Sequence, residues 1–190
     1  VTMDNLLRKL PIGIQTFEKL RRGDYLYVDK TDFVWKIAST STPYFLSRPR
    51  RFGKSLLLST FEAYFEGKRE LFEGLAIAGL ETEWKQYPVL HLDLNAEKYD
   101  STRALTEILS RQLTQWELKY GKGVDEETLA GRFSGVIRRA SEQAGCGVVV
   151  LVDEYDKPLL QALGDNALLD DYRKTLKAFY GVLKSSDRYL

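Results

Sequence analysis

The chain is organised around one stretch, Arg48-Pro49-Arg50-Arg51-Phe52-Gly53-Lys54-Ser55. An apolar run at residues 44–47 comes before it and is typical of a buried strand. Residues 56–65 come after it, with apolar side chains at helical spacing and no breaker before Gly67. This order of strand, Gly-Lys-Ser loop and helix is typical of a phosphate-binding loop, because a helix N-terminus presents unpaired N–H groups and a partial positive charge to an anion.

The Gly-Lys-Ser run supplies the residue types that triphosphate binding requires. Gly53 lets the backbone curl closely around a phosphate, Lys54 can reach the β- and γ-phosphates, and the Ser55 hydroxyl can ligate Mg²⁺. The complete P-loop signature is G-x-x-x-x-G-K-[ST], and its first glycine would fall at Arg48. Arginine adopts a positive φ only at a cost, and Pro49 fixes one φ, so we expect the turn into the loop to be built differently.

The basic residues of this loop compensate for the missing glycine in our interpretation. Arg50 or Arg51 would add positive charge at the phosphates, in place of backbone contacts that a glycine would allow. The predicted cofactor-binding residues are Arg50, Arg51, Phe52, Gly53, Lys54, Ser55 and Leu56. The alternative interpretation is a basic surface loop in front of an ordinary helix.

A second informative segment lies about a hundred residues further along the chain. Residues 148–152 form an unbroken, mostly β-branched apolar run, which is typical of a strand buried on both faces of a parallel sheet. The run ends in Asp153-Glu154-Tyr155-Asp156, which matches the Walker B pattern of ATPases that carry their own catalytic glutamate. Asp153 would hold Mg²⁺ and Glu154 would polarise the attacking water. A buried strand that meets solvent in an acidic turn is the alternative, but the Gly-Lys-Ser segment upstream favours a nucleotide site.

Length and composition restrict the class of protein. A chain of 190 residues with 44% hydrophobic and 29% charged residues is typical of one globular domain, and a net charge of +1 does not decide on a nucleic-acid partner. Cys146 is the single cysteine and His91 the single histidine, which excludes a disulfide framework and a Cys- or His-rich metal site. The sequence has no secretory-type N-terminus and no apolar run long enough to span a membrane, so we expect a cytoplasmic protein.

Several strings of this sequence resemble a bacterial family of predicted AAA-ATPase-like proteins. They are Leu-Pro-Ile-Gly-Ile-Gln-Thr-Phe at residues 10–17, Tyr-Leu-Tyr-Val-Asp-Lys-Thr at 25–31, and the segments 44–61, 64–68, 71–77 and 148–159. The resemblance covers almost the whole chain. The P-loop of this family also has an arginine where the first glycine is expected, so the departure at Arg48 is the family's own variant.

The resemblance implies an α/β fold, a three-layer α/β/α P-loop NTPase with a mostly parallel sheet. It implies a single domain over residues 1–190, in which 1–43 lead into a nucleotide-binding core at 44–190. Longer members of the family often have a C-terminal domain similar to PD-(D/E)XK nucleases, but nothing in these residues shows a nuclease.

The resemblance also implies that the sheet is truncated. ATPases of this division have the strand order 5-1-4-3-2, in which the P-loop strand is 1, residues 90–95 belong to strand 2 and residues 148–153 form strand 3. Strand 4, which carries a polar sensor residue, would begin about where the sequence ends. We therefore expect a fragment in which strands 1 and 3 pair directly, another chain fills the gap, or the sheet splits and invites self-association. Because the sensor strand would be missing, we expect ATP hydrolysis by these 190 residues to be weak or absent.

Further elements follow from periodicity and capping. We predict helices at 17–22, 33–39, 81–87, 101–120, 127–144 and 166–184, and strands at 25–28 and 89–95. Asn95 and Asp93 would end at the sheet edge that carries Glu154, because ligands of open α/β sheets bind at the carboxyl ends of the strands. Either side chain can then hydrogen-bond Glu154, or Asn95 simply opens the following turn. His91 is expected in the core.

Three functions are compatible with these observations. The first is an ATP-binding and ATP-hydrolysing regulatory domain of a larger protein, with Lys54 and Glu154 as catalytic residues and Ser55 and Asp153 as Mg²⁺ ligands. The second is a nucleic-acid-processing module whose ATPase drives an attached nuclease, which DNA-stimulated turnover would support. The third is an interaction domain with a vestigial nucleotide fold, which an unchanged ATP affinity in Lys54→Ala would favour. The implied partners are ATP and Mg²⁺, a further copy of the chain, and DNA through a C-terminal domain; no membrane is implied.

Overall fold

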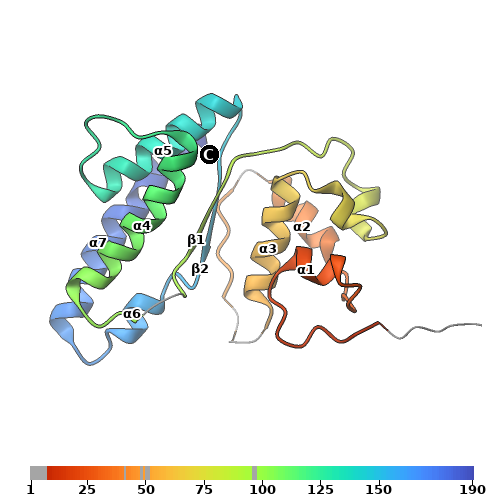
Figure 1. Cartoon of the computed structure of the whole chain (residues 1–190), viewed down its shortest axis with the longest axis horizontal. Coiled ribbons are helices and arrows are strands. Elements are labelled where there is room, and N and C mark those ends of the chain that lie inside the picture. Colours follow the sequence, from red (N-terminus) through yellow and green to blue (C-terminus); the bar gives the residue numbers. More distant parts are fainter. Residues whose placement is uncertain (1–7, 41, 48, 50–51, 96–97) are drawn as a thin grey trace, which may run out of the picture. The chain divides into compact units, whose positions relative to one another are not determined.

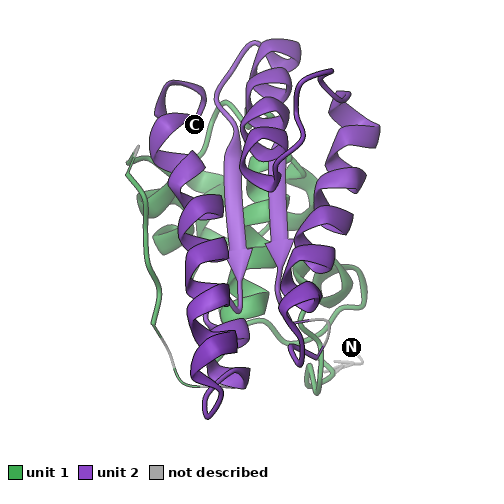
Figure 2. Ribbon diagram, turned by 90° about the vertical axis from the view of Figure 1, so that its left-hand side faces the viewer, with its two compact units in different colours: residues 1–86 green, residues 87–190 purple. Residues whose placement is uncertain are grey.

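The computed structural model describes residues 8–40, 42–47, 49, 52–95 and 98–190. The chain forms two compact units, Val1–Gln86 and Tyr87–Leu190, which Figure 2 shows in different colours. Each unit buries apolar side chains of its own. The prediction of a single domain over 1–190 stays a prediction.

Unit 1 is helical in the part that the structure describes. Its elements are α1 (Phe17–Arg22), α2 (Thr31–Ala38), α3 (Lys54–Phe65) and the short 3₁₀ helices η1 (Arg69–Phe72) and η2 (Ala76–Gly79). Aromatic rings form its centre. Phe17 contacts Tyr27 and Phe72 at centroid distances of 5.3 and 4.8 Å, and Trp84 packs against Phe72 and Tyr64 at 5.2 and 5.9 Å. Such ring pairs stabilise a core beyond the apolar area that they bury.

The start of α2 is fixed by one carboxylate. Asp29 accepts hydrogen bonds from the Thr31 amide (2.9 Å), the Thr31 hydroxyl (2.7 Å) and the Ala76 amide (2.7 Å). The buried Thr31 hydroxyl in turn accepts from the Ile77 amide at 3.1 Å. Burial raises the pKa of Asp29, but these donors outweigh it and leave that pKa below its usual value. The Asp29-Lys30-Thr31 string therefore joins α2 to η2.

Unit 2 contains the sheet. Its elements are β1 (Val89–Asp93), α4 (Thr102–Tyr120), α5 (Leu129–Ala144), β2 (Val149–Asp153), α6 (Lys157–Gln161), α7 (Asn166–Ser185) and the 3₁₀ helix η3 (Asp187–Tyr189). β1 and β2 are parallel neighbours, with Val89 opposite Val149 and Asp93 opposite Asp153. The chain is thus a mixed α/β protein with mostly helices and a small parallel sheet.

Helices α4, α5 and α7 lie together along the two strands (Figure 1). Their shared core centres on Phe133, whose ring stacks on Phe179 at 4.4 Å and on Trp116 at 5.6 Å. Leu90 and Leu92 of β1 are buried in the same cluster. The amphipathic spacing that predicted these helices is therefore the spacing of the residues that they bury.

Local capping explains where two of these helices begin. The Thr128 hydroxyl accepts from the Gly131 amide at 3.0 Å before α5, and the Asp165 carboxylate accepts from the Leu168 amide at 3.0 Å before α7. Gly145 ends α5 in a left-handed conformation with φ 66°. The helices predicted at 17–22, 33–39, 56–65, 101–120, 127–144 and 166–184 and the strands at 89–95 and 148–152 are confirmed, with bounds shifted by a few residues.

Three predicted elements are wrong. Residues 44–47 form no strand, since among the described residues only β1 and β2 pair as strands. The side chains predicted to be buried there are exposed: Tyr44 by 58%, Phe45 by 68% and Leu46 by 41%. The strand predicted at 25–28 is reduced to one bridge between Lys9 and Tyr25. In both places the apolar run predicted a strand, but the segment has no neighbouring strand, in the described part of the chain, with which to pair.

The helix predicted at 81–87 is absent for a local reason. The Glu81 carboxylate accepts from the amides of Glu83 (2.8 Å) and Trp84 (3.4 Å), and Trp84 has a φ of 46°. A side chain that binds nearby amides offers the backbone an alternative to the helix.

Among the helices that the structure describes, none is both long and apolar enough to cross a bilayer.

Candidate functional site

The Gly-Lys-Ser segment lies in unit 1, at the start of α3. Gly53 has φ 73° and ψ 25°, the left-handed conformation that glycine adopts without cost, and its carbonyl accepts from the Leu57 amide at 3.0 Å. Lys54 and Ser55 are the first two helical residues, so the loop passes directly into the helix. This is the loop-to-helix geometry that the motif predicts.

The N-terminal end of α3 has the electrostatics of an anion site. Its first turn contains Lys54 and no acidic residue, and the amides of a first turn have no acceptor within the helix. Lys54, Ser55 and Leu56 are half-buried, whereas Phe52 is exposed. The predicted contributors Arg50 and Arg51, like Arg48, lie outside the described residues. Helix α3 is anchored by Ser59, whose hydroxyl accepts from the Phe17 amide at 2.8 Å.

The acidic segment lies in unit 2, at the carboxyl ends of both strands. The register pairs Asp93 with Asp153, so the residues that follow each strand leave the sheet at one edge. Asp153 is buried, and one of its carboxylate oxygens accepts from the Glu154 amide at 2.9 Å. An edge of this kind is where open parallel sheets bind ligands.

Glu154 has an unusual backbone. Its φ is 53°, in the left-handed region that L-residues other than glycine rarely adopt, at a cost of about 1–2 kcal/mol. Such conformations persist where neighbouring contacts impose them, and they cluster at functional sites. The strain falls on the residue that the Walker B pattern names as the catalytic base.

The turn after β1 is held by side-chain hydrogen bonds of Asp93 and Asn95. Asp93 closes it, because its carboxylate accepts from the Asn95 amide at 2.7 Å. The Asn95 side-chain oxygen accepts from Lys157 Nζ at 2.8 Å, and the Asn95 carbonyl accepts from the same ammonium group. The sequence reasoning missed Lys157. A lysine just after the acidic cluster and an asparagine just after β1 were the available signal, since parallel neighbouring strands end at one edge.

Two tyrosines near the acidic segment can be excluded as bases. Burial raises the pKa of Tyr155, and the Asp156 carboxylate raises it further. Burial also raises the pKa of Tyr180 on α7, again with a contribution from Asp156. Both phenols therefore stay protonated at neutral pH.

The predicted metal ligands, Ser55 and Asp153, belong to different units. Within the described ranges, no group of three or more His, Cys, Asp or Glu side chains is arranged to hold a metal ion. The oxygen ligands that Mg²⁺ prefers are present in each segment as a hydroxyl and a carboxylate.

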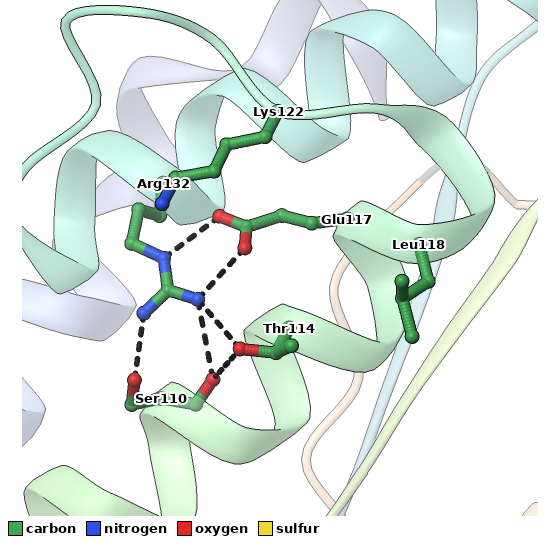
Figure 3. Close-up of a pocket in the computed structure, with 6 residues that line it drawn as sticks. All are labelled: Ser110, Thr114, Glu117, Leu118, Lys122 and Arg132. Atoms are coloured by element: carbon green, nitrogen blue, oxygen red, sulfur yellow. Dashed lines mark hydrogen bonds and ion pairs between the residues drawn. The ribbon is translucent and has the colours of Figure 1, made fainter.

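A pocket of about 430 Å³ lies elsewhere in unit 2 and contains none of the predicted site residues; Ser110, Thr114, Glu117, Leu118, Lys122 and Arg132 line it (Figure 3). Arg132 donates to both carboxylate oxygens of Glu117 at 2.7 and 2.8 Å, and also to Ser110 and Thr114. Its guanidinium is therefore engaged in joining α5 to α4.

Comparison with known proteins identifies the relationship. The family model described as "Predicted AAA-ATPase" matches residues 11–190. The chain belongs to the predicted AAA-ATPase family. A relative from Azotobacter chroococcum mcd 1, named "Uncharacterized protein in vnfD 5'region", is 41% identical over 184 residues. The match covers 96% of this chain and 36% of that relative, so the chain spans about a third of the relative's length. No solved structure matches the chain.

Membership in the predicted AAA-ATPase family confirms the resemblance of the sequence strings and supports a role in ATP binding. The family's expected Walker A variant and nuclease fusion stay predictions. So do the roles assigned to individual site residues.

Proposed function

We propose that this protein binds ATP with Mg²⁺ and hydrolyses it, as a P-loop domain of a larger bacterial protein. The observation that carries the proposal is left-handed Gly53 followed at once by α3 with Lys54 and Ser55 in its first turn. A phosphate at this helix end would meet first-turn amides that have no acceptor within the helix, the positive end of the helix dipole and an ammonium group. Membership in the predicted AAA-ATPase family supports the same function.

The proposal assigns a role to each segment. The backbone amides of residues 52–56 and the Lys54 ammonium group hold the phosphates, with added charge from Arg50 or Arg51. The Ser55 hydroxyl and the Asp153 carboxylate ligate Mg²⁺, which neutralises charge on the phosphates when it is bound. Glu154 accepts a proton from the attacking water.

The proposed fold is a three-layer α/β/α P-loop domain, of which β1 and β2 are two neighbouring strands. Their parallel pairing supports the predicted adjacency of strands 2 and 3. Self-association and action on DNA through a further domain stay predictions about the longer protein.

Replacing Lys54 tests the proposed binding. Lys54→Ala is expected to weaken binding of Mg·ATP by about tenfold or more, because a hydrogen bond from a charged donor is worth about 1.5–3 kcal/mol. Titration calorimetry with and without Mg²⁺ measures this. Lys36→Ala is the matched control, since Lys36 lies in the same unit and its ion pair with Asp32 is exposed. Wild-type protein that binds no ATP, or equal affinity in Lys54→Ala, would contradict the proposal.

A further inference from the structure

Helix α6 holds the segment that follows β1. Lys157 and Gln161 are four residues apart and therefore lie on one face of α6. Lys157 donates to the side chain and carbonyl of Asn95, and the Gln161 side-chain oxygen accepts from the Tyr99 amide at 3.0 Å. Two side chains of one short helix thus hydrogen-bond to Asn95 and Tyr99, in the segment after β1.

The same helix is tied to the acidic segment. The Lys157 amide donates to the Glu154 carbonyl at 3.0 Å, and the Leu94 amide donates to the Asp153 carbonyl at 3.2 Å. Leu94 is fully buried, and its own carbonyl accepts from the Tyr99 hydroxyl at 2.8 Å. These bonds form a continuous network from the end of β1 to the turn that carries Glu154.

This network bears on the conformation of Glu154. A glutamate at φ 53° is unfavourable in isolation, so neighbouring contacts must hold it there. Glu154 lies in the turn between β2 and α6. The charge-assisted bond from Lys157 to Asn95 joins the start of α6 to the segment that follows β1, the strand paired with β2. Removing it would free the turn to relax toward an ordinary backbone conformation.

We propose that Lys157 is a positioning residue for Glu154, acting through its bond to Asn95. The inference rests on the proposed function, in which the Glu154 carboxylate receives a proton from water. Lys157 itself does not contact the nucleotide. Its role is to fix the direction in which the Glu154 side chain leaves the backbone, on which proton transfer depends.

Lys157→Met and Asn95→Ala test the proposal by separating turnover from binding. Each is expected to lower kcat for ATP hydrolysis by about tenfold, with the Kd for Mg·ATP within about threefold of wild type. The double variant is expected to be no slower than Lys157→Met, because Lys157→Met already removes the bond to the Asn95 side chain. Lys157→Arg, which retains a charged donor, is expected to restore part of the rate. Lys174→Met, at an exposed position on α7, is the matched control and should have no effect.

Each outcome of this experiment decides between the proposals. The experiment uses the longer protein that contains these residues, since weak or absent hydrolysis is expected of residues 1–190 alone. If its wild-type form does not turn over ATP, the proposed hydrolysis is overturned, and the positioning role with it. An active wild type with unchanged kcat in Lys157→Met overturns the positioning role alone. Loss of Mg·ATP affinity in Lys157→Met, as expected for Lys54→Ala, would assign Lys157 to binding and also overturn it. Should Lys157→Met not fold, Asn95→Ala decides, since it removes only an exposed side chain.

Discussion

Glu154→Gln is expected to lower ATP turnover by about 100-fold or more, because an amide cannot accept the proton of the attacking water. Glutamine has nearly the same shape and can adopt the same backbone, so the affinity for Mg·ATP should change by less than about threefold. Steady-state hydrolysis and calorimetric titration on one preparation of the longer protein that contains these residues measure the two quantities.

Glu142→Gln is the control for this change. Glu142 lies on α5 of the same unit, and its ion pair with Arg138 is exposed on both sides. This variant should retain full turnover. Retained turnover in Glu154→Gln would remove Glu154 from the proposed chemistry, whereas lost affinity would show that it contributes to binding instead.

Arg132→Met is expected to lower the free energy of unfolding at neutral pH by about 3 kcal/mol. The side chains of Arg132 and Glu117 are only 12% and 7% exposed, so the substitution leaves a carboxylate buried without its charged partner. Urea unfolding followed by circular dichroism measures the loss. Arg138→Met on the same helix is the control, since its exposed pair with Glu142 is worth less than about 1 kcal/mol.

The acid dependence of this difference follows from the pKa of Glu117. The hydrogen bonds from Arg132 hold that pKa below its usual value, although burial opposes the effect. A lowered pKa stabilises the folded state above the unfolded value of about 4.3, and this stabilisation is lost as the pH falls through the folded value. The difference in free energy of unfolding between wild type and Arg132→Met should therefore become smaller at acid pH. An equal gap at neutral and acid pH would contradict the role assigned to this ion pair.

Local signals predicted much of the fold. Helices α4, α5 and α7 follow apolar spacing that the packed core uses, and the apolar run before Asp153 predicted β2. The helix after the Gly-Lys-Ser run was also predicted from apolar spacing at residues 56–65, and α3 begins at Lys54.

The wrong predictions concern segments whose structure depends on a pairing strand or a hydrogen-bond acceptor, which the spacing of apolar residues does not reveal. Residues 44–47 have the apolar character of a strand, but a strand also needs a neighbour to pair with. Residues 81–87 were predicted to form a short helix, yet the Glu81 carboxylate accepts from amides that a helix would use.

The candidate site shows the same division. Gly53, Lys54, Ser55, Asp153 and Glu154 were predicted from motifs, because each motif is local. The contact of Lys157 with Asn95 spans 62 positions and requires the register of β1 and β2, which no local pattern provides.

The central claim of the proposed function is that Lys54 and Asp153 act on the same Mg·ATP. A double-mutant cycle of Lys54→Ala and Asp153→Asn, read as Kd for ATP in the presence of Mg²⁺, tests it most directly. We predict that each change weakens binding and that their effects are coupled by about 1 kcal/mol or more. An unchanged affinity in Asp153→Asn, or effects that simply add, would contradict it.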